Sequence, residues 1–163
     1  MQSKHMSSYQ HTQTGYVIII ALLTGILIDL AVAYWAFAAE ALTAPSIAIV
    51  SFVVAVLFLS LLIFSTLTVA IDTAYLRISF GPVYLIRRKW LLDDIASCRT
   101  VENSWWYGWG IHLTPHGILY NVSGFGAAEI RTAKGRVFRV GTDEPEQLTQ
   151  AINAAISGAS QSK

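Results

Sequence analysis

Charged residues and cysteines are scarce in this chain of 163 residues. Only 13% of the residues are charged, against roughly 25% in ordinary soluble domains, and the mean hydropathy is +0.51. The formal net charge of +1 provides no basic surface of the kind that binds nucleic acid. The single cysteine, Cys98, excludes an internal disulfide and fits a reducing compartment. The composition is therefore too apolar for an ordinary soluble protein.

Two long apolar runs account for the low share of charged residues. They cover residues 16–39 and 47–69, and a short polar bend that contains Pro45 separates them. Each run is long enough for a helix that crosses a bilayer core of roughly 30 Å, which takes about 20 residues. The sequence therefore predicts a transmembrane hairpin over residues 16–65. A cleaved signal peptide is the alternative, but the first run is longer than a signal core.

The basic residues predict the orientation of this hairpin. Ten of the eleven Lys and Arg residues lie at or after Arg77, and the bend has none. Because loops rich in Lys and Arg stay on the cytoplasmic side, we expect both termini and the C-terminal domain in the cytoplasm. The first expected partner is thus the lipid bilayer of the cell (inner) membrane.

One acidic residue, Asp29, lies near the middle of the first span. A carboxylate at this depth costs on the order of 3 kcal/mol, so a protonated state or a hydrogen bond between helices is expected. In an antiparallel hairpin Ser60 is the polar residue expected nearest in depth. A proton or ion relay and a polar helix contact both remain open. The spans hold no second acid, histidine or basic residue, which favours the contact.

Outside the spans, the sequence pattern divides the chain into a tail, a β-rich domain and a helix. Residues 1–15 are polar without an apolar face, which predicts a disordered tail. From Leu67 onward apolar and polar residues alternate, as in half-buried strands. Strands are expected at 66–71, 76–80, 83–90, 96–102, 110–113, 118–122, 127–133 and 136–141. An amphipathic helix follows and should end at Gly158, so that residues 66–157 form the domain and 158–163 a second tail.

The expected fold is α+β, and its order resembles a known architecture. The segments that carry the resemblance are LRISFG (76–81), LDDI (92–95), GWGI (108–111), YNVSG (120–124) and RVGTDEP (139–145). The chain resembles uncharacterised bacterial membrane proteins in which a helical hairpin precedes a pleckstrin-homology-like domain. The resemblance implies two orthogonal sheets, a small β-barrel or sandwich, closed at one end by the C-terminal helix. It implies no reaction.

An aromatic segment between two expected strands is the richest candidate site. Trp105, Trp106, Tyr107 and Trp109 are more aromatic surface than a domain of about 90 residues can bury completely. Tryptophan and tyrosine suit half-wet surfaces, so the segment could bind a partner or the membrane interface. Packing against the barrel end or the hairpin is the alternative.

A basic run and scattered histidines are the remaining candidates. Arg87, Arg88 and Lys89 could contact anionic lipid, at about 1 kcal/mol each, or form a solvated strand face. His112 and His116 with Cys98 lack the ligand number and spacing of a zinc site. The sequence therefore predicts no metal, no cofactor and no catalytic residue.

Three functions are consistent with these features. The first is a non-catalytic, membrane-anchored binding or scaffolding protein that recruits or steadies a membrane protein complex at the cytoplasmic face. The second is a sensor of anionic lipid headgroups that uses the basic run and the tryptophans. The third is a subunit of a transport or proton-relay complex that uses Asp29. A membrane protein or further copies of the chain are the expected partners.

Overall fold

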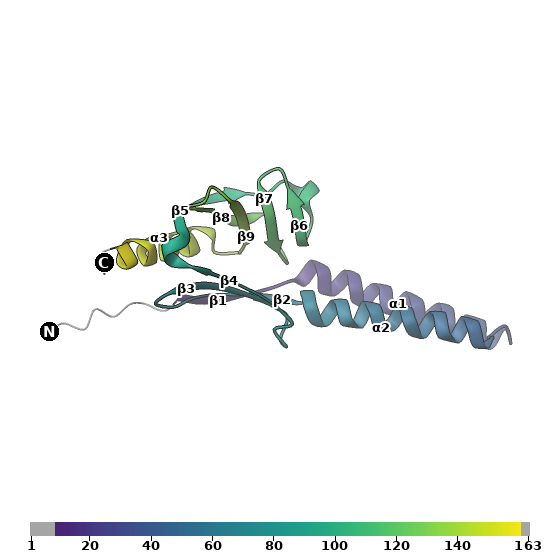
Figure 1. The fold of residues 1–163 in the computed structure, drawn as a ribbon. Helices are drawn as coiled ribbons and strands as arrows, with labels where there is room; N and C mark the ends of the chain where they lie inside the picture. Colours follow the sequence, from purple (N-terminus) through teal and green to yellow (C-terminus); the bar gives the residue numbers. More distant parts are fainter. Residues whose placement is uncertain (1–8, 161–163) are drawn as a thin grey trace.

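The computed structural model describes residues 9–160 and consists of a helical hairpin and a two-sheet β region with a C-terminal helix (Figure 1). The elements, in chain order, are β1 (Tyr9–Thr14), α1 (Tyr16–Ala38), α2 (Ala44–Phe64), β2 (Thr66–Ile71), β3 (Tyr75–Phe80), β4 (Ile86–Leu91), η1 (Leu92–Asp94), β5 (Ile95–Glu102), η2 (Trp105–Tyr107), β6 (Gly110–Thr114), β7 (Gly117–Asn121), β8 (Gly126–Thr132), β9 (Val137–Gly141) and α3 (Pro145–Ser160).

The hairpin helices α1 and α2 carry most of the apolar surface that has no protein cover. They are 23 and 21 residues long, with mean hydropathies of 2.5 and 3.1, and none of their most apolar residues is buried. Length, composition and exposure together indicate membrane association. The second helix ends at Phe64, inside the predicted hairpin of residues 16–65, and residues 66–71 form the predicted strand β2, although they also belong to the second apolar run.

The expectation of a disordered tail over residues 1–15 is wrong for its second half. Residues 9–14 form β1, which pairs antiparallel with β2 from Tyr9↔Ile71 to Thr14↔Thr66. The inward side chains of β1 include His11 and Gln13, so the strand shows no apolar alternation that would reveal it. Backbone pairing with β2 forms it instead. Residues 1–8 lie outside the described residues.

Single residues join the two helices to this strand pair. Gly15 connects β1 to α1, and Ser65 connects α2 to β2. The Gly15 amide donates a 2.8 Å hydrogen bond to the Ser65 carbonyl, so the strand ladder continues to the base of the hairpin. Figure 1 shows the hairpin leaving the β region from the end where β1 and β2 meet it. The connection leaves no flexible linker between the two parts.

The β region consists of two sheets, of which one contains a parallel pair. The four-stranded sheet has the order β1-β2-β3-β4 and the five-stranded sheet the order β5-β8-β9-β7-β6. All neighbours are antiparallel except β7 and β9, which are parallel. The parallel pair arises because β8 does not lie next to β7 in the sheet. The chain leaves one strand position free between them, and β9 later fills this position, parallel to β7.

The core lies between the two sheets and α3. Phe80 and Leu67 come from the four-stranded sheet, Ile130 from the other sheet, and Leu148 and Ile152 from α3, all fully buried. The predicted buried face of the helix is therefore confirmed. The expected stop at Gly158 is wrong, because α3 runs to Ser160. Residues 161–163 of the expected tail lie outside the described residues.

We expect Gly15→Ala to destabilise the protein, because the joint between β1 and α1 has no room for a methyl group. A Cβ there would lie 2.9 Å from the Phe64 carbonyl oxygen and 3.0 Å from that of Val122. Overpacking of this kind costs about 1–3 kcal/mol. Thermal unfolding of the purified protein in detergent, followed by circular dichroism, measures the loss.

Gly158→Ala is the matched control. A Cβ at Gly158 meets nothing within 4 Å, and alanine raises helix stability by about 1 kcal/mol relative to glycine inside a helix. Equal stabilities of the Gly15→Ala protein and the unsubstituted protein would contradict the tight joint.

Candidate functional site

The aromatic segment exposes two of its four rings. Trp105 and Trp106 lie in the short helix η2, with 63% and 76% of their surface exposed. Their rings stack at a centroid distance of 4.0 Å and an angle of 26°. Stacking fixes the two rings relative to each other, so they present a preformed apolar surface to the outside.

The other two aromatic residues anchor this segment to the domain. The ring of Tyr107 meets His116 edge-on at 6.3 Å. The Trp109 indole donates a 3.3 Å hydrogen bond to the Gly124 carbonyl, and its ring lies 6.3 Å from that of Phe125. The structure therefore separates the predicted group into an exposed pair and a supporting pair. The sequence could not make this division, because all four residue types suit both roles.

An exposed strand edge follows the aromatic segment, and the sequence did not reveal it. Strand β6 pairs with β7, and no strand between residues 9 and 160 pairs with its other side. It contains no Lys, Arg or Pro, the residues that usually protect such an edge. Leu113 on β6 is 86% exposed, and Ile118, its neighbour on β7, is 41% exposed. This edge offers free backbone groups beside uncovered apolar side chains.

The predicted basic run lies on β4, an edge strand of the four-stranded sheet, and does not form one cluster. All three side chains are exposed, but Arg87 and Lys89 point to one face of the sheet and Arg88 to the other. Arg87 donates a 2.8 Å hydrogen bond from Nε to the Tyr84 carbonyl. The ammonium of Lys89 lies 5.2 Å from the Tyr75 ring centre. The run thus offers two cations per face at most.

The structure does not pair the two polar residues of the hairpin. The Ser60 hydroxyl donates a 2.8 Å hydrogen bond to the Val56 carbonyl one turn earlier. The Asp29 Oδ2 atom is buried and has no hydrogen-bond partner among residues 9–160. Gly25 faces Leu57 across the hairpin, which places Asp29, one turn nearer the bend, opposite about Val53. Ser60 is therefore not at the depth of Asp29.

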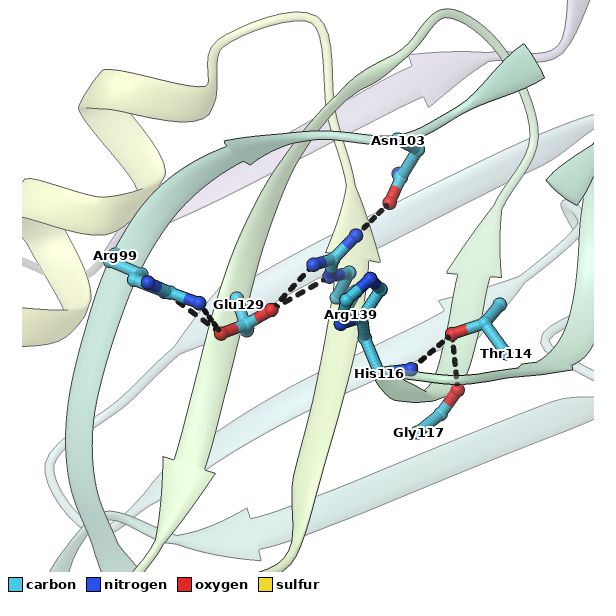
Figure 2. A network of polar contacts seen from close by, with 7 residues as sticks. All are labelled: Arg99, Asn103, Thr114, His116, Gly117, Glu129 and Arg139. Carbon is cyan, nitrogen blue, oxygen red and sulfur yellow. Dashed lines mark hydrogen bonds and ion pairs between the residues drawn. The ribbon is translucent and has the colours of Figure 1, made fainter. Parts of the chain in front are cut away.

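A buried ionic network crosses the five-stranded sheet (Figure 2). Arg99, Glu129 and Arg139 occupy directly opposite positions on β5, β8 and β9. Arg139 donates two hydrogen bonds to Glu129 Oε2, at 2.9 and 2.7 Å, and a third of 3.2 Å to Asn103 Oδ1. Arg99 donates to Glu129 Oε1 from the exposed side. The network holds together three strands and Asn103, which lies two residues before the aromatic segment.

The two arginines keep the Glu129 carboxyl ionised in spite of its burial. Only 6% of its side chain is exposed, and burial alone would raise its pKa. The hydrogen bonds and charges of Arg139 and Arg99 outweigh this effect and lower the pKa below its ordinary value. The sequence signal is an acidic residue and a basic residue, Glu129 and Arg139, inside two otherwise largely apolar strands, but their pairing depends on strand register, which the sequence does not show.

The other chemically active side chains are tied into the structure. Burial raises the pKa of the Cys98 thiol to about 11, so the thiol is protonated at neutral pH. His112 makes a 2.9 Å hydrogen bond to the Trp109 carbonyl. Among residues 9–160, no three His, Cys, Asp or Glu side chains are placed to hold a metal ion.

We expect Arg139→Met to destabilise the protein by about 3–5 kcal/mol, because it leaves the buried Glu129 without its main partner. Arg77→Met is the matched control. Arg77 forms an ion pair with Asp72, but both side chains are substantially exposed, and such pairs contribute at most about 1 kcal/mol. Similar losses in both variants, measured by denaturant unfolding, would contradict a special role for the buried pair.

The same unfolding measurement has a pH signature. Because the folded pKa of Glu129 is lowered, its contribution to stability is present above the unfolded value, near 4.5, and is lost as the pH falls through the folded value. The Glu129→Gln protein should lack this part of the acid dependence. An unchanged pH profile would show that the carboxylate is not stabilised in the folded state.

Comparison with known proteins gives no relative from which a function could be transferred. No protein-family model matches the sequence, and no curated protein matches it significantly. The geometry therefore carries the functional argument. Its main features are an apolar hairpin, two rigid joints, an exposed tryptophan pair and a free strand edge.

Proposed function

We propose that this protein is a membrane-anchored, non-catalytic binding protein that holds a partner protein at the cytoplasmic face of the cell membrane. In this proposal α1 and α2 cross the bilayer, and both termini and the β region lie in the cytoplasm. The concentration of Lys and Arg at and beyond Arg77 supports this orientation. The exposed, stacked Trp105–Trp106 pair is the single observation that carries the binding role.

The single-residue joints support a scaffold more than a flexible tether. A domain on a long linker explores many orientations, whereas a domain joined through Gly15 and Ser65 keeps one orientation to its helices. A fixed surface loses less conformational freedom when it binds, which favours recognition by a rigid partner. The β region would thus present its binding surface at a constant height above the membrane.

The domain architecture also fits the proposed pleckstrin-homology-like identity. A four-stranded sheet faces a second sheet, and a C-terminal helix packs against the core that they enclose. The parallel neighbours β7 and β9 are a departure from that pattern. The identity remains part of the proposal, and a binding role is what such a domain would add to a membrane anchor.

The partner surface that we propose combines the tryptophan pair with the edge of β6. The pair supplies the large aromatic contact typical of binding hot spots. The free edge of β6 can pair with an extended strand of the partner, and Leu113 can pack against that strand. A membrane protein with an exposed cytoplasmic strand has the matching chemistry.

Site-specific photo-crosslinking in native membranes tests this proposal. We expect a photoreactive amino acid at Trp106 or at Leu113 to form a discrete protein adduct, because both positions face the proposed partner. The same amino acid at Lys134, an exposed turn residue, is the control and should give none. Adducts are resolved by mass after affinity purification of the chain.

The outcomes separate the possible occupants. An adduct of twice the mass of the chain identifies a second copy as the partner, and an adduct with another protein supports a heterologous complex. Adducts with lipid alone, or equal yields at Trp106, Leu113 and Lys134, would contradict a protein-binding surface.

A further inference from the structure

The turn between β3 and β4 exposes three consecutive apolar residues that the proposed function does not use. Val83, Tyr84 and Leu85 have 54%, 43% and 57% of their surface exposed. Such a run at the tip of a turn is uncommon on a surface that faces only water, and it marks a contact. The position of this turn in the fold indicates what the three residues contact.

The turn lies against the C-terminal end of the apolar helix α2. A Cβ at Gly81 would be 2.0 Å from the Leu62 carbonyl oxygen and 3.0 Å from that of Ile63, so the turn rests directly on the last helical turn. The Gly81 amide also donates a 2.8 Å hydrogen bond to the Thr66 carbonyl. The exposed residues therefore begin two positions after a glycine that lies against the end of the hairpin.

The turn is held in one conformation, with a cation behind its apolar tip. Tyr84 has a φ of +52°, a left-handed conformation that costs about 1–2 kcal/mol for a residue with a side chain. Its carbonyl accepts the hydrogen bond from Arg87 Nε, and the guanidinium lies 5.6 Å from the Tyr84 ring centre. An apolar tip that contains a tyrosine and is followed by an arginine matches the change in polarity from the acyl boundary to the headgroups.

We propose that Val83, Tyr84 and Leu85 insert into the lipid monolayer from which α2 emerges, with Arg87 at the phosphate level. The turn is then a third membrane contact beside the two helices. The occupant is lipid, because the turn adjoins the end of a span and its charge pattern matches an anionic interface. This inference rests on the proposed membrane anchoring by the hairpin.

A third contact away from the hairpin axis has a mechanical consequence. Two adjacent helices fix the depth of the β region, but the hairpin and the β region can still tilt together as one body relative to the membrane plane. A turn anchored in the same monolayer restricts that tilt and fixes which face of the β region points to the cytoplasm. The proposed partner surface would then have one direction as well as one height.

Depth-dependent quenching of a fluorophore tests the insertion with the full chain. Val83→Cys and Lys134→Cys are made in a Cys98→Ala background, labelled with an environment-sensitive dye, and reconstituted into vesicles of phosphatidylcholine and phosphatidylglycerol. Lys134 is the control because it lies at the end of the β region away from α2. The amide of its neighbour Ala133 donates a hydrogen bond to the Asp94 carbonyl, and the Leu92 amide in the same short helix donates one to the Ala74 carbonyl, beyond the far end of β2. Quenchers are phosphatidylcholines that carry a nitroxide at the headgroup or near the start of the acyl chain.

We expect blue-shifted emission at residue 83 and a loss of intensity with the acyl-chain nitroxide, and neither change at residue 134. Emission typical of a water-exposed dye at residue 83 overturns the inference. Blue-shifted emission that lipid nitroxides do not quench also overturns it, because a second copy of the chain that covers the turn would give this result. Flotation of the labelled chain with the vesicles tests the anchoring separately. A chain that floats but shows no quenching at residue 83 refutes the insertion and leaves the anchor intact.

Discussion

The backbone ladder between β1 and β2 is the interaction on which the rest of the structure depends. It joins the segment before the hairpin to the segment after it, so α1 begins and α2 ends at one pair of strands. The side chains of β1 extend the connection, because Gln13 donates to the Ser123 carbonyl and His11 Nε2 lies 2.6 Å from Asp143 Oδ1. One short polar strand therefore links the hairpin, both sheets and the start of α3.

Apolar surface without protein cover is concentrated on the side of the hairpin. No residue of α1 or α2 is buried, and the turn after β3 rests on the end of α2. Figure 1 also places β6, whose residue Leu113 is the most exposed large apolar side chain described, at the edge of its sheet nearest to the hairpin. Exposed apolar surface is costly in water, so this arrangement indicates membrane association and supports the proposed partner surface.

The sequence predicted the elements that depend on local pattern and missed those that depend on register. The two apolar helices, the buried face of α3 and the strands from residue 66 onward follow from periodicity and run length, except that residues 83–85, predicted to begin a strand, lie in the turn before β4. Strand β1 was missed because its pairing with β2 is set across the whole hairpin. The Glu129–Arg139 pair and the free edge of β6 were missed for the same reason, since both arise from strand order. The tryptophans were predicted as candidates, but only the structure shows which of them are exposed.

The orientation of the β region on the hairpin is the central claim, and a distance measurement between them tests it most directly. Spin labels at Ala41, in the bend, and at Arg131, on the surface of β8, can be placed in a Cys98→Ala background and measured by pulsed electron resonance in lipid nanodiscs. Rigid joints at Gly15 and Ser65 predict one narrow distance distribution. A broad or multiple distribution, as a flexible tether gives, would contradict the account.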